Sequence, residues 1–153
     1  MEYSEPELDI ICDSCCSIFL LVASSDSKIH ENEEDFFLYN YQKILSRLNI
    51  ISDVREKAVL EFWAQDRFTH QHIVQMKSDP KSMHLQRIHT ALKLIRKKEN
   101  EQDFLQYRNA LMNLAAVISK ISRSFWGFGN PISKSEEKVL NELSIILNVP
   151  IPK

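Results

Sequence analysis

Two groups of carboxylates are the side chains of this sequence best suited to chemistry. Asp26, Glu33 and Glu34 follow an apolar stretch near the start, and Glu136 and Glu137 lie near the other end. Carboxylates that face one pocket repel one another unless a cation joins them, and such oxygen ligands suit Ca²⁺ or Mg²⁺. The alternative needs no ligand, because the helix dipole and capping preferences already favour acids in the first turn of a helix.

Other reactive side chains form no catalytic pattern. The sequence holds no G-x-S-x-G, no phosphate-binding glycine loop and no H-E-x-x-H motif. Four histidines (His70, His72, His84 and His89) match no zinc spacing, and half-exposed polar roles are the better interpretation. We therefore predict no enzyme activity; a helical metal-dependent hydrolase is a third possibility that lacks the expected His and Asp ligands.

Three cysteines gather in "CDSCC", at Cys12, Cys15 and Cys16. They lie too close together to link distant parts of the chain by disulfides. A zinc site would need further ligands, and no second cysteine pair exists. Because cysteine often behaves as a small buried hydrophobe, we predict core packing.

An aromatic, glycine-containing stretch, "RSFWGFGNP" at 123–131, is predicted to be a loop. Phe125, Trp126 and Phe128 either fold back over the core or form a docking patch for a partner protein. Both interpretations remain open from the sequence.

Helices must position these residues, since the chain has only two glycines and few alternating apolar runs. Ser4 and Pro6 suit the start of the first helix, and past Cys15 that helix is apolar on nearly every side. It should therefore lie in the middle of the domain. We predict an all-α fold, a compact bundle of about seven helices and no strands, with helices near 5–25, 30–48, 52–65, 69–76, 81–98, 101–122 and 134–147.

Length and charge limit the possible classes of protein. A chain of 153 residues, 44% hydrophobic and 26% charged, fits a single globular domain covering 1–153. Ten acids and one base occur through Asp35, whereas 81–98 holds six bases and no acid. This asymmetry could orient partners or a membrane headgroup, but the net charge of −2 argues against nucleic-acid binding. The sequence predicts no transmembrane segment and no signal peptide, and hence a cytoplasmic protein.

A weak internal two-fold repeat relates the two carboxylate groups. Each copy passes from an apolar helix through a polar loop to Ile-x-x-x-Glu-Glu and then to Leu-Asn-(Ile or Val). The first copy has Ile29, Glu33, Glu34 and 48–50; the second has Ile132, Glu136, Glu137 and 147–149. Such repetition predicts a pseudo-symmetric helical domain.

With this pattern the sequence resembles the tellurite-resistance TerB-like family. "ASSDSKIHENE" places Ala23, Asp26, Ile29 and Glu33 on that family's motif, although Ser27 replaces its usual glycine, and Ile132 and Glu136 match the second segment. The resemblance implies a bacterial-type module that presents acids and handles metal ions in stress-response complexes at the membrane.

The sequence thus predicts a non-enzymatic stress-response module that binds a divalent cation, a partner protein, or both, through acidic loops. The alternative is a metal-independent helical adaptor that binds a protein partner through the aromatic loop at 123–131.

Overall fold

The computed structural model describes residues 3–24, 75–125 and 134–152, with residues 5, 8, 12 and 121–125 as backbone only. The described residues form helices, without a strand among them, which confirms the all-α prediction. The helices are α1 (Glu5–Ala23), α5 (Lys81–Lys98), α6 (Glu101–Phe125) and α7 (Lys134–Leu147). The helices predicted at 30–48 and 52–65, and most of the one at 69–76, lie outside the described residues.

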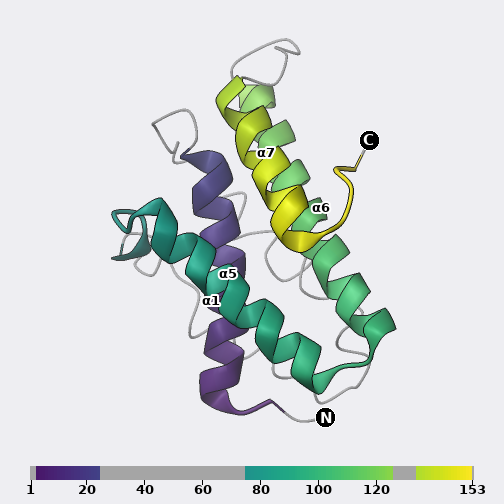
Figure 1. The fold of residues 1–153 in the computed structure, drawn as a ribbon. Helices are drawn as coiled ribbons and strands as arrows, with labels where there is room; N and C mark the ends of the chain where they lie inside the picture. Colours follow the sequence, from purple (N-terminus) through teal and green to yellow (C-terminus); the bar gives the residue numbers. More distant parts are fainter. Residues whose placement is uncertain (1–2, 25–74, 126–133, 153) are drawn as a thin grey trace.

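Helix α1 begins and packs as its sequence predicts. The Ser4 hydroxyl accepts the Glu7 backbone N–H at 3.3 Å, and the Glu7 carboxylate accepts the Ser4 N–H at 2.9 Å. This reciprocal capping box, with proline in the first turn, satisfies backbone donors that an open helix start leaves unpaired. Every side chain from Ser14 to Ala23 is buried, so α1 is the central helix. It contacts α5, α6 and α7 (Figure 1).

Helices α6 and α7 run antiparallel and pack side by side (Figure 1). The structure corrects the predicted end of α6, because the helix continues past residue 122 to Phe125. Arg123, Ser124 and Phe125 contain no helix breaker, and Gly127 is the first glycine that the chain reaches. Phe125 therefore belongs to the last turn of a helix and not to the predicted loop.

The Leu-Asn-Val sequence at 147–149 forms the C-terminal end of α7. Asn148 adopts a left-handed conformation with φ 54°, which asparagine tolerates better than most residues. Its N–H donates to the Ile145 carbonyl at 3.2 Å, and the Val149 N–H donates to the Ser144 carbonyl at 3.2 Å. These bonds form a Schellman motif, which ends the helix at Leu147 as predicted.

The apolar side chains of the four helices meet in one core, which includes most of α1. Tyr107 and Phe19 are its largest fully buried side chains. The other buried apolar side chains include Ile88, Leu92 and Ile95 of α5, Leu111, Leu114, Ala115 and Ile118 of α6, and Leu140, Leu143 and Leu147 of α7. Within the described part of the chain, no helix is long and apolar enough to cross a membrane.

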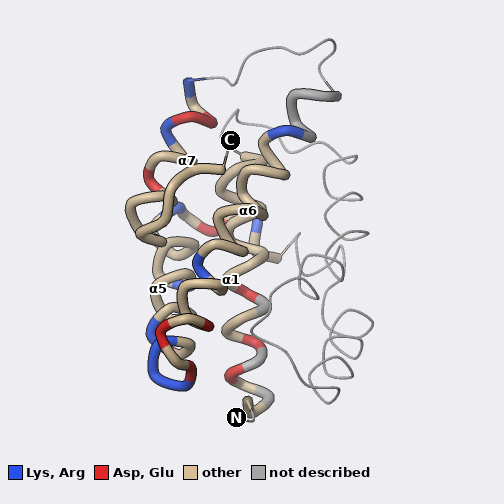
Figure 2. Tube along the Cα trace, turned by 90° about the vertical axis from the view of Figure 1, so that its right-hand side faces the viewer, with Lys and Arg blue, Asp and Glu red and all other residues tan. Residues whose placement is uncertain are grey.

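The uneven charge along the sequence is partly neutralised inside the fold. Lys98 at the end of α5 contacts Glu7 at the start of α1, with 2.6 Å between Nζ and Oε1. Figure 2 shows the basic end of α5 beside this acidic start of α1. Lys81 likewise pairs with Glu142 at 2.6 Å. Two of the six bases at 81–98 are therefore paired with acids of other helices.

Candidate functional site

Only one of the two predicted carboxylate groups lies within the described residues. Glu136 and Glu137 occupy the first turn of α7, whereas Asp26, Glu33 and Glu34 lie outside the described ranges. The two neighbouring glutamates have different surroundings: Glu136 is 3% exposed, and Glu137 is exposed to solvent. Whether the two groups converge stays a prediction.

Glu136 is held at the contact between α6 and α7. The Ser119 hydroxyl of α6 donates to Oε2 of Glu136 at 2.8 Å, and Ser119 is itself fully buried. The first-turn position also gives the carboxylate a favourable interaction with the helix dipole. A hydroxyl donor and the dipole together reduce the cost of burying this acidic side chain.

The described residues contain no complete metal site. Among 3–24, 75–125 and 134–152, no three or more His, Cys, Asp or Glu side chains come together in a way that could hold a metal ion. Glu136 supplies one carboxylate, which is too few for a Ca²⁺ ion with six to eight oxygen ligands. A cation at this position would need ligands from outside these ranges.

The aromatic loop that the sequence offers as a docking patch is also mostly outside the described ranges. Phe125 is described by its backbone alone, in the last turn of α6, and Trp126 and Phe128 lie beyond it. Core covering and partner docking by these aromatic residues both stay predictions.

The sequence did not predict a buried polar cluster at the start of α5. His84 was expected to be half-exposed but is only 4% exposed, so that prediction is wrong. Its Nδ1 atom lies 3.1 Å from the Ser17 hydroxyl of α1 and 3.2 Å from Nη1 of Arg87. Since a guanidinium only donates, Nδ1 accepts and the proton of the neutral ring resides on Nε2.

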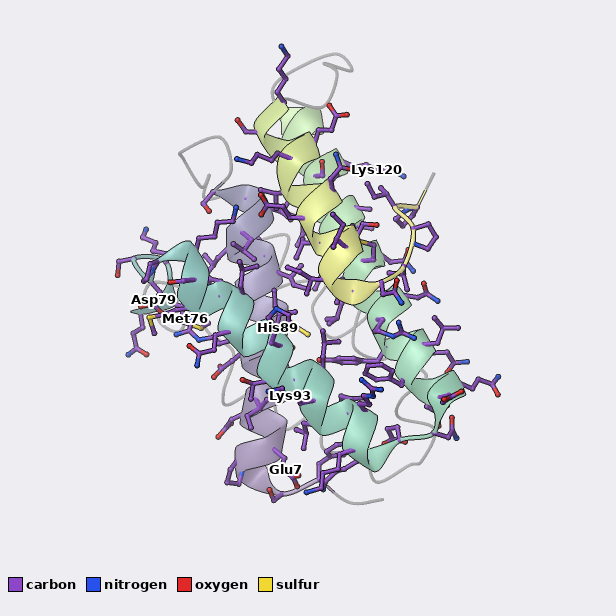
Figure 3. All side chains as sticks on the ribbon, viewed as in Figure 1. Glu7, Met76, Asp79, His89, Lys93 and Lys120 are labelled. Carbon is purple, nitrogen blue, oxygen red and sulfur yellow. The ribbon has the colours of Figure 1, made fainter. Side chains whose placement is uncertain are left out.

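An ion pair borders this histidine. Arg87 Nη2 donates to Asp79 Oδ2 at 2.6 Å, in the turn that precedes α5. Burial lowers the pKa of His84, the Arg87 charge lowers it further, and the Asp79 charge opposes them. Figure 3 labels Asp79 and Met76 at this end of α5, and His89 farther along the same helix.

A signal in the sequence could have found the buried histidine. His84 precedes Ile88 by four residues and Ala91 by seven, so all three lie on one helix face. Ile88 and Ala91 are completely buried. In contrast, the side chain of His89 is exposed.

The cysteines that the structure describes are part of the core, as predicted. Cys15 and Cys16 are buried. Burial raises the pKa of the Cys15 thiol to about 12, so it remains protonated at neutral pH and is a poor nucleophile or metal ligand. Next to it, the Ser14 hydroxyl lies 3.0 Å from the Tyr107 hydroxyl, which joins α1 to α6. These groups have structural roles.

Comparisons of the chain with protein-family models, with curated proteins and with solved structures find no match. The TerB-like resemblance therefore stays a prediction based on the short motifs around Asp26 and Glu136.

Proposed function

We propose that this chain is a non-enzymatic, TerB-like stress-response module that binds a divalent cation, a partner protein, or both, through its acidic loops. Ca²⁺ and Mg²⁺ are the expected ions, because both prefer oxygen ligands. The proposed setting is cytoplasmic, with a protein partner that can belong to a membrane-associated complex and without nucleic acid.

One observation supports the cation hypothesis: of the two glutamates that begin α7, the one that matches the family motif is turned into the protein. Glu136 meets the Ser119 hydroxyl there, 2.8 Å away. A buried carboxylate beside a hydroxyl presents two oxygens in a region of low dielectric, where a cation is attracted more strongly than at the surface.

The proposal includes a finer description of the fold. We infer about seven helices with a weak internal two-fold repeat, in which α7 is the second copy of the helix predicted at 30–48. Under this repeat, Glu33 would occupy the position of Glu136, and Asn49 would end its helix as Asn148 ends α7.

An ion titration followed by thermal unfolding tests the cation hypothesis. An ion that binds only the folded state raises stability by RT ln(1 + [L]/Kd), about 2.7 kcal/mol at a concentration 100 times Kd. We expect millimolar Ca²⁺ or Mg²⁺ to raise the melting temperature of the unmodified chain. Glu136→Gln should abolish this increase, as should Asp26→Asn combined with Glu33→Gln.

Glu137→Gln is the matched control, since it removes the same charge from the next position of the same helix. Because Glu137 is exposed, its substitution should reduce the ion effect less than Glu136→Gln does. The cation hypothesis would be wrong if the ions left the melting temperature of the unmodified chain unchanged, or if Glu136→Gln retained the full increase.

An absent ion effect would favour the second hypothesis, a metal-independent adaptor using the loop at 123–131. Ile145 on α7 gives this hypothesis some support, since it is 79% exposed and is the most exposed large apolar side chain of the described residues. A single exposed isoleucine is common on protein surfaces, however, so it carries less weight than the buried Glu136.

A further inference from the structure

A hollow of about 610 Å³ lies where the turn between α5 and α6 meets the C-terminal end of α7. These three elements can be followed in Figure 1. Its volume falls within the range of roughly 300–1,000 Å³ that is usual for small-molecule sites. The side chains that matter for its chemistry are two cations, two acids and two apolar groups: Arg96, Arg108, Glu99, Glu101, Phe104 and Leu105.

Arg108 is the residue in this hollow that points to a ligand. Its Nη1 donates to the carbonyl of Leu147, the last residue of α7, at 3.3 Å. Its guanidinium carbon lies 4.5 Å from the centre of the Phe104 ring. The buried Nε has no hydrogen-bond partner among the described residues. Arg108 as a whole is only half-buried and lines the hollow, so its guanidinium can donate charge-assisted hydrogen bonds to a bound molecule.

The charges around the hollow limit which anion fits. Arg96 extends from the last turn of α5 and is exposed. Glu99 accepts a hydrogen bond from the Tyr3 hydroxyl at 2.5 Å, and Glu101 is exposed in the first turn of α6. Two arginines are balanced by two glutamates, so the lining has no excess positive charge to offset a phosphate with nearly two negative charges, and a singly charged anion fits better.

The apolar side chains supply the other half of the site. Phe104 is partly buried against the core, and Leu105 is 43% exposed although it borders the hollow. We propose that this hollow binds a small carboxylate that carries an apolar stem. The carboxylate accepts hydrogen bonds from Arg108 and Arg96, and the stem covers Phe104 and Leu105. This site is separate from Glu136 and does not depend on the cation hypothesis.

A titration followed by NMR tests this site with phenylacetate, acetate and inorganic phosphate as probes. We expect phenylacetate to shift the backbone amide signals of Leu105 and Asn148 and to bind at least fivefold more tightly than acetate or phosphate. The reason is that only phenylacetate combines a single charge with a ring that can pack against the apolar side chains.

Two substitutions in the hollow and one beside it test whether phenylacetate binds at this site or is attracted by positive charge in general. Arg108→Lys keeps the charge near the end of α7 but loses the guanidinium edge, and Arg96→Gln removes a lining charge. Each should weaken phenylacetate binding at least fivefold. Lys97→Gln, which removes an exposed charge from the neighbouring position outside the lining, should change it less than twofold.

Three outcomes would overturn the proposal. Phenylacetate could leave the amide signals unshifted, phosphate could bind more tightly than phenylacetate, or Lys97→Gln could weaken binding as much as Arg96→Gln. A folded-state NMR spectrum of each variant shows whether a loss of binding comes from a loss of structure.

Discussion

Two helix pairs of this protein bury an ionisable side chain in different ways. Between α1 and α5, His84 lies against the hydroxyl of Ser17; between α6 and α7, Glu136 lies against the hydroxyl of Ser119. The histidine avoids a buried charge because burial, and then the Arg87 charge, favour its neutral ring, which accepts a hydrogen bond from Arg87. The carboxylate instead gains from a hydroxyl donor and a helix start. Thus His84 is buried between α1 and α5 as a neutral side chain, whereas the buried charge of Glu136 between α6 and α7 is stabilised by a hydroxyl dipole and the helix dipole.

The central helix α1 contacts α5, α6 and α7, so it packs against both helix pairs. A substitution that disrupts its packing should therefore cause the largest loss of stability. Phe19 is completely buried. Phe19→Ala should lower the free energy of unfolding by about 3–5 kcal/mol, through lost burial and the cavity left behind. Urea denaturation measures this loss. Val117→Ala on α6, where the side chain is 38% exposed, is the control and should cost clearly less. A loss of stability for Phe19→Ala no larger than that of the control would contradict a central role for α1.

Removing the two serine hydroxyls compares the helix pairs directly. Ser119→Ala should lower the free energy of unfolding by about 1.5–3 kcal/mol, since it deprives a buried carboxylate of a donor. Ser17→Ala should cost only about 0.5–1.5 kcal/mol, because it removes a bond between neutral groups. Both replacements gain the same helix propensity, so urea denaturation of the two variants isolates the difference. Equal losses would show that the buried carboxylate needs its hydroxyl no more than the histidine does.

Acidification should lower the free energy of unfolding, because His84 between α1 and α5 becomes protonated. Its pKa is lowered in the folded protein from an ordinary value of 6.5, so the unfolded chain binds the proton more readily. The stabilising effect of the neutral ring is complete above pH 6.5 and is lost as the pH falls through that value towards the lowered pKa. One proton limits the slope to about 1.4 kcal/mol per pH unit.

Urea denaturation between pH 7 and pH 5 measures this slope. His84→Gln should flatten it, whereas His89→Gln, which alters an exposed histidine of the same helix, should leave it in place. A slope that survives His84→Gln would assign the pH dependence to another group.

The sequence predicted the helices of this fold better than it predicted their polar contacts. Apolar periodicity and capping residues are local signals, so Ser4 and the bounds of α7 were predicted from them. Contacts between helices are not local. The pairing of Ser119 with Glu136 depends on how α6 and α7 are aligned, which no spacing in the sequence reveals. The polarity of His84 favours a half-exposed position, but its place on the apolar face of α5 buries it.

We expect the smallest change in stability from substitutions at the outer end of the α1–α5 pair, where the charged side chains are close to solvent. The hydrogen bond from Lys98, and then that from the Ser4 backbone, lower the pKa of Glu7 from 4.5 to about 2. Glu7 therefore contributes stability above pH 4.5, and this contribution is lost as the pH falls through about 2. An NMR titration of the Glu7 carboxyl in Lys98→Gln should show its pKa raised, though still below 4.5, because the Ser4 bond remains. Lys97→Gln should leave that pKa low. If Lys98→Gln left it near 2, the capping box and not the ion pair would govern this end of the helix pair.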